Sequence, residues 1–214
     1  MGDDAIAASR DAIAISRGLP ADLHDHGVAL FDEAFGDKMR MAIPDRPRRL
    51  AYMARVFRGD RAVIALRAGE LVGMLGLASG SDAYRGGLLD VPWDPRPFLD
   101  LMGLRGAIRA AVGLRLAQHR PAPDELYIDG VAVAATDRGR GIGSQLLEEA
   151  AVIAHEHGLR WLRLDVVDTN PRAQALYERL GYRVTKVERM GPLERWTGFG
   201  AIISMERPAL GPVP

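Results

Sequence analysis

The chain has no cysteine among its 214 residues. This absence excludes disulfides, thiolate metal sites and a cysteine nucleophile. An excess of one charge is also lacking, because 28 Lys and Arg residues balance 28 Asp and Glu residues. Without net charge the protein exerts no general attraction on nucleic acid or an anionic membrane, so we expect neither as a partner. Any anion that the chain binds must be held by local groups.

Long hydrophobic runs are missing as well. No stretch approaches the roughly 18 apolar residues of a membrane-spanning helix. The opening MGDDAIAASR has neither the cationic start nor the apolar core of a secretory signal, so we expect a cytoplasmic protein. With 48% hydrophobic residues, the chain can bury one sizeable core. The simplest organisation is one domain over residues 1–214.

Hydrophobic periodicity and turn residues divide the chain into strands and helices. The predicted strands are 12–16, 62–67, 70–78, 125–134, 161–167, 182–190 and 199–206. The predicted helices are 20–35, a second that starts after Asp45 or Pro47 and ends at Gly59, 144–157 and 171–180, with Gly36 ending the first. Residues 84–122 read as an insertion with a helix near 98–118, and residues from about 208 to 214 read as a disordered tail.

One stretch, DRGRGIGS at 137–144, combines three alternating glycines with two arginines; we call it the glycine turn. A Walker phosphate loop needs lysine and then serine or threonine after its last glycine, but Ser144 and Gln145 follow Gly143. A dinucleotide fingerprint needs glycine or alanine where Ser144 stands, although Asp165 lies at about the expected distance. The third interpretation is a tight strand-to-helix turn.

A turn of this kind is suited to an anion. The backbone N–H groups of residues 139–144 point into a concavity at the positive end of a helix dipole. Glycines let a phosphate approach the backbone, and Arg138 and Arg140 add fixed positive charge. Two arginines at a helix start oppose the dipole unless an anion is present, so the turn predicts a phosphate site.

The histidines do not predict a metal site. His24 and His26, like His155 and His157, are two residues apart on predicted helices and so do not share a helix face as metal ligands would. We expect no metal.

Two motifs in order carry a family resemblance. Residues 125–150 contain Arg138-x-x-Gly141-x-Gly143, and residues 162–184 contain Asn170-x-x-Ala173-x-x-x-Tyr177 followed by LGY. Together they resemble the GNAT superfamily of acyl-CoA-dependent N-acyltransferases. The resemblance is firm over residues 124–206 and does not cover the insertion at 84–122.

The resemblance implies an α/β (α+β) fold with a mixed, mostly antiparallel twisted sheet flanked by helices, whose fourth and fifth core strands splay apart. It also implies that acetyl-CoA is the acyl donor, with its pantetheine in that gap and its pyrophosphate on the glycine turn. The implied donor-binding residues are Val131, Ala132, Val133, Arg138, Gly139, Arg140, Gly141, Ile142, Gly143, Ser144 and Asn170.

Acetyl transfer to an amine requires removal of a proton from the amine and a proton for the leaving thiolate. By resemblance, Tyr177 supplies the proton and a carboxylate near position 129 removes one. Odd positions of strand 125–133 share a face, which places Glu125, Tyr127, Asp129, Val131 and Val133 together. Asp129 is the first choice of base, with Glu125 acting through water as an alternative and a purely orienting Asp129 also open.

The acceptor is the least specified part. The apolar insertion, with Trp93 and Phe98, resembles a lid over a small molecule more than an open groove for a peptide. We therefore expect a small-molecule primary amine, with a protein or peptide amine, or a non-catalytic acyl-CoA-binding regulatory module, as alternatives. Family resemblance also allows a homodimer.

Overall fold

The structure is a computed structural model that describes residues 12–40, 43–80, 87–89 and 121–209. Its described part contains one seven-stranded sheet in the order β1-β2-β3-β4-β5-β7-β6. All neighbouring strands are antiparallel except β4 and β5, which are parallel. The strands are β1 Ile13–Arg17, β2 Ala62–Arg67, β3 Glu70–Ser79, β4 Glu125–Val133, β5 Trp161–Val167, β6 Arg183–Arg189 and β7 Ala201–Pro208.

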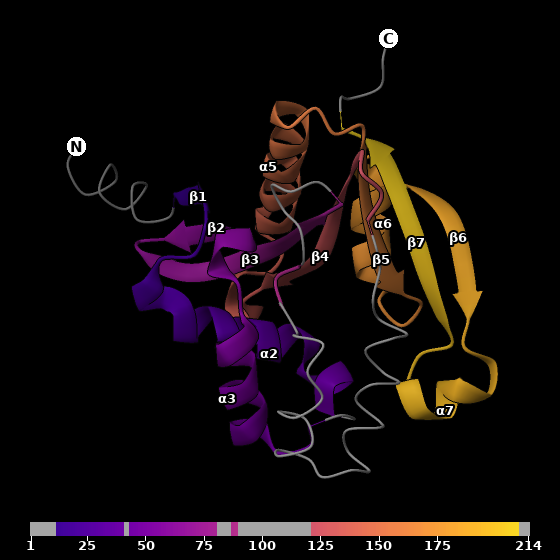
Figure 1. Ribbon diagram of the computed structural model, residues 1–214, viewed down its shortest axis with the longest axis horizontal. Coiled ribbons are helices and arrows are strands. Elements are labelled where there is room, and N and C mark those ends of the chain that lie inside the picture. The colour runs from indigo at the N-terminus through magenta and orange to yellow at the C-terminus, as the bar shows by residue number, and fades with distance from the viewer. Residues whose placement is uncertain (1–11, 41–42, 81–86, 90–120, 210–214) are drawn as a thin grey trace.

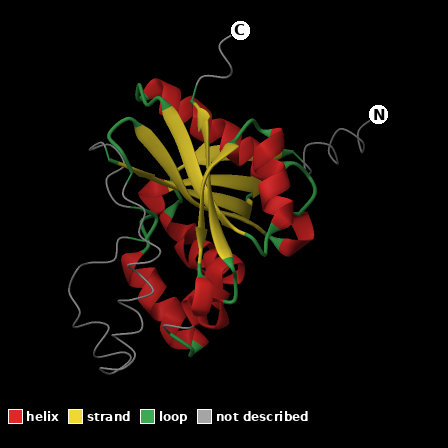
Figure 2. Ribbon diagram, turned by 90° about the vertical axis from the view of Figure 1, so that its right-hand side faces the viewer, coloured by secondary structure: helices red, strands yellow, loops and turns green. Residues whose placement is uncertain are grey.

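Helices cover both faces of this sheet (Figures 1 and 2). The longer helices are α2 His24–Arg40, α3 Arg46–Val56, α5 Ile142–Glu156 and α6 Pro171–Arg179, with a short α7 Glu194–Thr197. Short 3-10 turns occur at Ala21–Leu23, Gly59–Arg61, Ala135–Asp137 and Gly191–Leu193. Helices α5 and α6 lie on one face, and α2 and α3 lie below the β1–β4 half on the other (Figure 1).

Two hydrophobic cores correspond to these two faces. The larger lies under α5 and α6 and includes Leu75, Leu126, Leu146, Leu162 and Tyr177. The smaller lies under α2 and α3 and includes Phe31, Met53, Ile64, Met74 and Ala132. Strand β4 contributes to both cores, so it is sandwiched between the two layers. The mixed sheet with helices on both sides is the fold that the sequence predicted.

Local signals set several helix ends as expected. The Asp45 carboxylate accepts the Arg48 N–H at 3.0 Å and the Asn170 side chain accepts the Ala173 N–H at 3.2 Å, so both residues are N-caps. Gly158 and Gly181 follow α5 and α6 in the left-handed region, with φ of +67° and +85°. These caps confirm the predicted starts of α3 and α6 and the predicted ends of α5 and α6.

Gly36 does not end its helix, which is a correction to the sequence prediction. Helix α2 continues through Gly36 to Arg40. A Cβ at Gly36 would lie 2.7 Å from Asp32 Oδ1 and 3.4 Å from an Arg49 nitrogen, so the glycine makes room for that buried ion pair. Tertiary packing, rather than a helix stop, explains the residue.

Two other boundaries also differ. Helix α5 starts at Ile142 with Gly141 as its N-cap, rather than at Ser144, because the left-handed turn closes earlier than expected. The tail does not begin at 208: Pro208 belongs to β7, and the Ala209 N–H donates to Arg160 O at 2.9 Å. Pairing with the start of β5 orders both residues.

The insertion at 84–122, including the helix expected near 98–118, lies largely outside the described residues. Of its described residues, Leu88 is fully buried, and its carbonyl accepts the Arg58 N–H at 2.8 Å. Within the described part of the chain, no helix is long and apolar enough to cross a membrane.

Candidate functional site

Strands β4 and β5 pair over only part of their length. The parallel register runs from Glu125 opposite Trp161 to Ile128 opposite Leu164, and then ends. Both strands continue, to Val133 and Val167, without pairing to each other. The sheet therefore opens between β4 and β5 from residue 129 onward, as the family resemblance implied (Figure 1).

A β-bulge lies at the mouth of this opening. Gly76 of β3 pairs with Gly130 and Leu77 pairs with Ile128, which leaves Asp129 as an extra residue. A Cβ at Gly130 would lie 2.7 Å from the Phe35 ring, so a glycine here allows the close approach of α2. Bulge and glycine together hold Asp129 at the point where the two strands separate.

The bulge overturns one expectation about faces. Strict alternation placed Val131 and Val133 on the same face as Tyr127 and Asp129, but both valines pack on the α5 side of the sheet. The extra residue at 129 shifts the alternation, so odd positions change face there. Ala132 faces the α2 core instead.

The backbone of β4 beyond the bulge has two distinct edges. The Ala134 N–H donates to Val72 O of β3 at 2.9 Å, and Ala132 lies opposite Met74 in the same ladder. Since alternate residues direct their N–H and C=O groups to opposite edges, Val131 and Val133 direct theirs into the opening. The expected strand-like contacts of a donor at residues 131–133 therefore fall on the two valines, while the Ala132 backbone belongs to the β3 ladder.

The glycine turn connects β4 to α5 as the sequence predicted. Gly139 and Gly141 are both left-handed, with φ of +83° and +79°, and no atom lies within 4 Å of where their Cβ atoms would be. The first N–H groups of α5 follow directly. The structure thus places the N–H groups of residues 139–144 at the start of a fifteen-residue helix.

A buried carboxylate anchors this turn. Asp137 is 2% exposed; its Oδ1 lies 3.0 Å from Arg67 Nη2, and its Oδ2 accepts the Thr136 hydroxyl at 2.7 Å. The sequence reasoning missed this role, since Arg67 lies far away at the end of β2. A charged residue immediately before the glycine run was the available signal.

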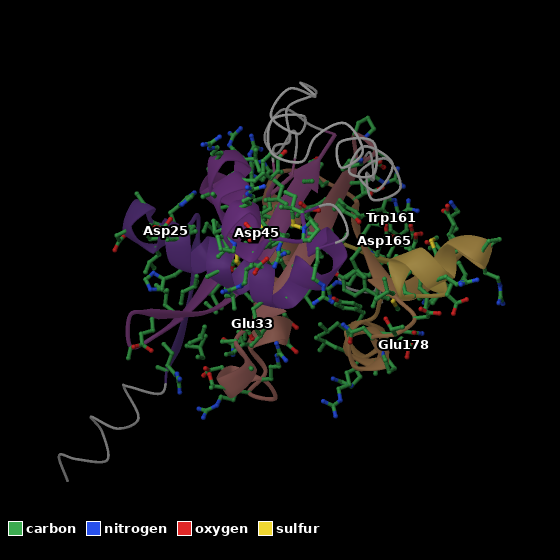
Figure 3. The ribbon with its side chains drawn as sticks, turned by 90° about the horizontal axis from the view of Figure 1, so that it is seen from below. Asp25, Glu33, Asp45, Trp161, Asp165 and Glu178 are labelled. Atoms are coloured by element: carbon green, nitrogen blue, oxygen red, sulfur yellow. The ribbon has the colours of Figure 1, made fainter. Side chains whose placement is uncertain are left out.

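The arginines of the turn differ in their surroundings. Arg138 donates through Nε to Val133 O at 3.0 Å, and its Nη2 lies 3.5 Å from Glu33 Oε1 on α2. Figure 3 shows Glu33 on the side of α2 near the start of α5. Arg140 is exposed. The Ile142 side chain is buried in the core, which leaves only its backbone for a ligand.

Two predicted residues lie on α6 and at its start. Asn170 caps the helix through its side-chain oxygen. Tyr177 is 8% exposed in the larger core, with its ring centroid 5.9 Å from that of Tyr182. Burial raises the pKa of Tyr177 to about 12, so the phenol stays protonated at neutral pH and can donate a proton.

Asp129 has solvent access but is closely surrounded by protein atoms. Its Oδ2 accepts the Leu88 N–H at 3.0 Å, and a Cβ at Gly87 would lie 2.7 Å from the same oxygen. Desolvation raises the pKa of Asp129, and the Leu88 hydrogen bond opposes this only in part. The carboxyl is therefore a stronger base than an ordinary aspartate, and it also fixes the backbone at Leu88.

Further charged side chains lie next to Asp129 on the same face. The Tyr127 hydroxyl donates to Asp165 Oδ2 at 3.1 Å, and Arg163 Nη1 lies 3.6 Å from Glu125 Oε2. Burial, with the negative charges of Asp165, Asp129 and Glu125, raises the pKa of Tyr127. Tyr127 is thus a hydrogen-bond donor at neutral pH, which does not suit it to the role of a base.

Arg163 and Asp165 are site residues that the sequence did not predict. Parallel pairing places Arg163 directly opposite Tyr127, and Asp165 and Asp129 each come one residue after the last pair. Figure 3 labels Trp161 and Asp165, which lie on β5. The available signal was the alternation in WLRLDVV, where charged residues take every second position of a strand whose other positions are buried.

Metal-ligand clusters are not found among the described residues: no group of three or more His, Asp or Glu side chains could hold an ion there. The chemistry of the described site lies in backbone N–H groups, carboxylates, arginines and tyrosines.

The fold and the site together define a class of proteins: a mixed sheet opens between β4 and β5, and a glycine turn lies beside the opening. The model of the acetyltransferase (GNAT) family matches residues 29–182, and the chain belongs to this family. This confirms the resemblance that the two motifs carried.

Curated relatives match over shorter segments. A thialysine N-epsilon-acetyltransferase of Bos taurus is 41% identical over 56 residues, which cover 26% of this chain and 33% of that protein. An L-2,4-diaminobutyric acid acetyltransferase of Nocardia farcinica is 33% identical over 81 residues, or 36% of this chain and 42% of that protein. The matches thus span about a third to two fifths of these relatives' own length.

Solved structures resemble the chain over nearly its whole length. An N-acetyltransferase of Staphylococcus aureus superposes with a TM-score of 0.61 at 16% identity, covering 91% of this chain and all of the other. At this identity the similarity shows a common fold.

Proposed function

We propose that the protein transfers an acetyl group from acetyl-CoA to a primary amine of a small molecule. One observation carries the proposal: the open edge of β4 leads from the glycine turn, which is suited to a pyrophosphate, directly to Asp129 at the mouth of the opening. Family membership supports the acetyl-CoA donor.

On the donor side, the residues present fit acetyl-CoA. The N–H groups of residues 139–144 and the arginines Arg138 and Arg140 suit its pyrophosphate. The Val131 backbone and the Val133 N–H, which face the opening, suit its pantetheine amides. The side-chain amide nitrogen of Asn170 remains for the donor, since its oxygen caps α6. When bound, acetyl-CoA supplies a thioester whose carbonyl carbon accepts the amine.

The reaction balances without any further reagent. The acceptor arrives as an ammonium ion, and Asp129 takes one of its protons so that a nitrogen lone pair is available. The C–N bond forms, the C–S bond breaks and the sulfur takes a proton from Tyr177. The nitrogen then loses its second proton, which restores the Tyr177 hydroxyl. The products are the N-acetyl amine, free CoA thiol and one proton released to solvent. The outward N–H of Val133 is our candidate for stabilising the carbonyl oxygen.

The acceptor face supports a small cationic acceptor. We define this face as Glu125, Tyr127, Asp129, Arg163 and Asp165; the Tyr127 hydroxyl donates to Asp165, and the negative charges of all three carboxylates raise its pKa. Such a face attracts an ammonium group. The curated relatives are named for thialysine and diaminobutyric acid, both small amines, which favours this class over a protein amine.

The test is a thiol-release assay with acetyl-CoA over a panel of small amines, amino acids and peptides. We expect release with small primary amines and N-acetyl products by mass spectrometry. Release with peptides alone would replace the small-molecule acceptor by a protein acceptor. Tight acetyl-CoA binding with no release across the whole panel would overturn the proposal and identify a binding module.

A further inference from the structure

Two charged groups on β5 have polar atoms that the protein itself leaves without partners. Asp165 Oδ1 and Arg163 Nε are buried, and neither has a hydrogen-bond partner within the part of the chain that the structure describes. Buried polar groups are nearly always satisfied, and a buried donor or acceptor without a partner is costly. Their side chains share one face of β5, two residues apart.

The position of this pair relates it to the reacting centre. Asp129 and Asp165 each follow the last parallel pair, Ile128 opposite Leu164, and Arg163 lies two residues before Asp165, opposite Tyr127. Along a strand, two residues span about 7 Å. An acceptor whose amine reacts beside Asp129 can therefore reach Arg163 with a chain of a few carbons.

The chemistry of the pair is that of a zwitterion site. A guanidinium binds carboxylates through a planar fork of donors, while Asp165 accepts from an ammonium group. Arg163 would not favour binding of a simple diamine, because its positive charge repels cations. The carboxylates nearby, Glu125 and Asp129, together with Glu206 opposite Arg163 on β7, leave the face acidic enough for an acceptor with two ammonium groups.

We propose that Arg163 and Asp165 bind the α-carboxylate and α-ammonium of a diamino acid whose side-chain amine is acetylated. This inference rests on the proposed function and names its acceptor class. Arg163 and Asp165 are specificity-determining residues that contact the acceptor, while Tyr127 is a positioning residue that holds Asp165 through its hydroxyl.

Three acceptors that differ by one group each test the proposal on the unmodified protein. L-2,4-Diaminobutyrate carries both groups, 1,3-diaminopropane lacks the carboxylate and 4-aminobutyrate lacks the α-ammonium. We expect kcat/KM for diaminobutyrate to exceed that for either analogue by about tenfold to a hundredfold, the usual effect of losing hydrogen bonds to a charged group. Equal kcat/KM for all three would overturn the inference.

Variants assign each group to its residue. Arg163→Met should reduce the preference for diaminobutyrate over 1,3-diaminopropane to about twofold or less through a higher KM for diaminobutyrate, with Arg163→Lys restoring part of it. Asp165→Asn should remove the preference over 4-aminobutyrate. The KM for acetyl-CoA should stay unchanged in all three variants, which a general loss of structure would not allow.

Arg160→Met is the matched control, because Arg160 is 73% exposed just before β5 and should leave every preference intact. A preference for diaminobutyrate that survives in both Arg163→Met and Asp165→Asn would contradict the assignment. No thiol release with any of the three acceptors, nor with a broader amine panel, would instead contradict the proposed function itself.

Discussion

The glycine turn and the acceptor face are built in opposite ways. The turn is one continuous segment whose binding groups are backbone N–H groups presented by Gly139, Gly141 and the start of α5. The acceptor face consists of side chains from β4 and β5, brought together by four parallel residue pairs. A backbone site tolerates few changes of conformation but many of side chain, whereas a side-chain site changes its specificity with a single substitution.

The largest effect is expected on the acceptor face, from Asp129→Asn. The asparagine oxygen can still accept the Leu88 N–H, so the fold should persist while the base is lost. We expect kcat/KM for the amine to fall about 10² to 10⁴-fold. CoA affinity, measured by calorimetry, should not change.

The same variant has a pH signature. Because the pKa of Asp129 is raised, wild-type activity should fall as pH drops through a value above the ordinary aspartate range. This limb of the pH profile should be absent in Asp129→Asn. Asp124→Asn changes an exposed side chain just before β4. This variant should keep both the wild-type rate and the fall in activity at low pH. A rate for Asp129→Asn within twofold of wild type would exclude Asp129 as the base.

Tyr177→Phe tests the acid on the donor side. We expect kcat to fall about tenfold to a hundredfold, less than for the base, because a thiolate is a good leaving group and leaves readily without help. Since burial raises the pKa of Tyr177 to about 12, no activity loss from its ionisation should occur below about pH 11.

Tyr182→Phe is the control for this change. The Tyr182 ring packs beside the Tyr177 ring in the same core, so removal of its hydroxyl should leave kcat unchanged. Equal kcat for Tyr177→Phe and wild type would show that Tyr177 contributes to core packing and does not act as the proton donor.

The variants Gly141→Ala and Gly158→Ala compare the glycine turn with an ordinary glycine at a helix C-terminus. Both Gly141 and Gly158 are left-handed, and a methyl group at either meets no atom within 4 Å. Alanine should therefore destabilise both variants similarly, by about 1 to 2 kcal/mol in urea unfolding. The KM for acetyl-CoA should rise about tenfold only in Gly141→Ala, through the added methyl and the distorted N–H groups. An equal KM for acetyl-CoA in both variants would show that the glycine turn does not bind the donor.

Glu33→Gln should have the smallest effect. Glu33 competes with a phosphate for Arg138, but the pair is exposed and such pairs contribute about 0.2 to 1 kcal/mol. We expect CoA to bind up to about fivefold more tightly, with the gain shrinking at high salt. Weaker CoA binding in Glu33→Gln would mean that Glu33 orients Arg138 rather than competing for it.

Contiguous features were predictable from the sequence. The glycine turn, the N-caps Asp45 and Asn170 and the glycines after α5 and α6 act within a few residues, and local rules describe such interactions.

Features that depend on tertiary contacts were not predictable from the sequence. Gly36 signals a helix stop locally, and only the Asp32–Arg49 pair beside it explains why α2 continues. Val131 changes face because β4 has one extra residue opposite β3 at the bulge. The sequence alone does not reveal that extra residue, because it depends on how the two strands pair. Arg163 and Asp165 enter the site through parallel pairing with a distant strand, so no local pattern connects them to Asp129.

A crystal structure of the CoA complex is the decisive test of donor binding at the glycine turn and the β4–β5 opening. We expect pyrophosphate oxygens within hydrogen-bond distance of the N–H groups of residues 139–144, and pantetheine between β4 and β5 with its amides on Val131 and Val133. The thiol should point toward Asp129 and the Tyr177 hydroxyl. CoA bound elsewhere, or an intact β4–β5 ladder closed over residues 129–133, would contradict it.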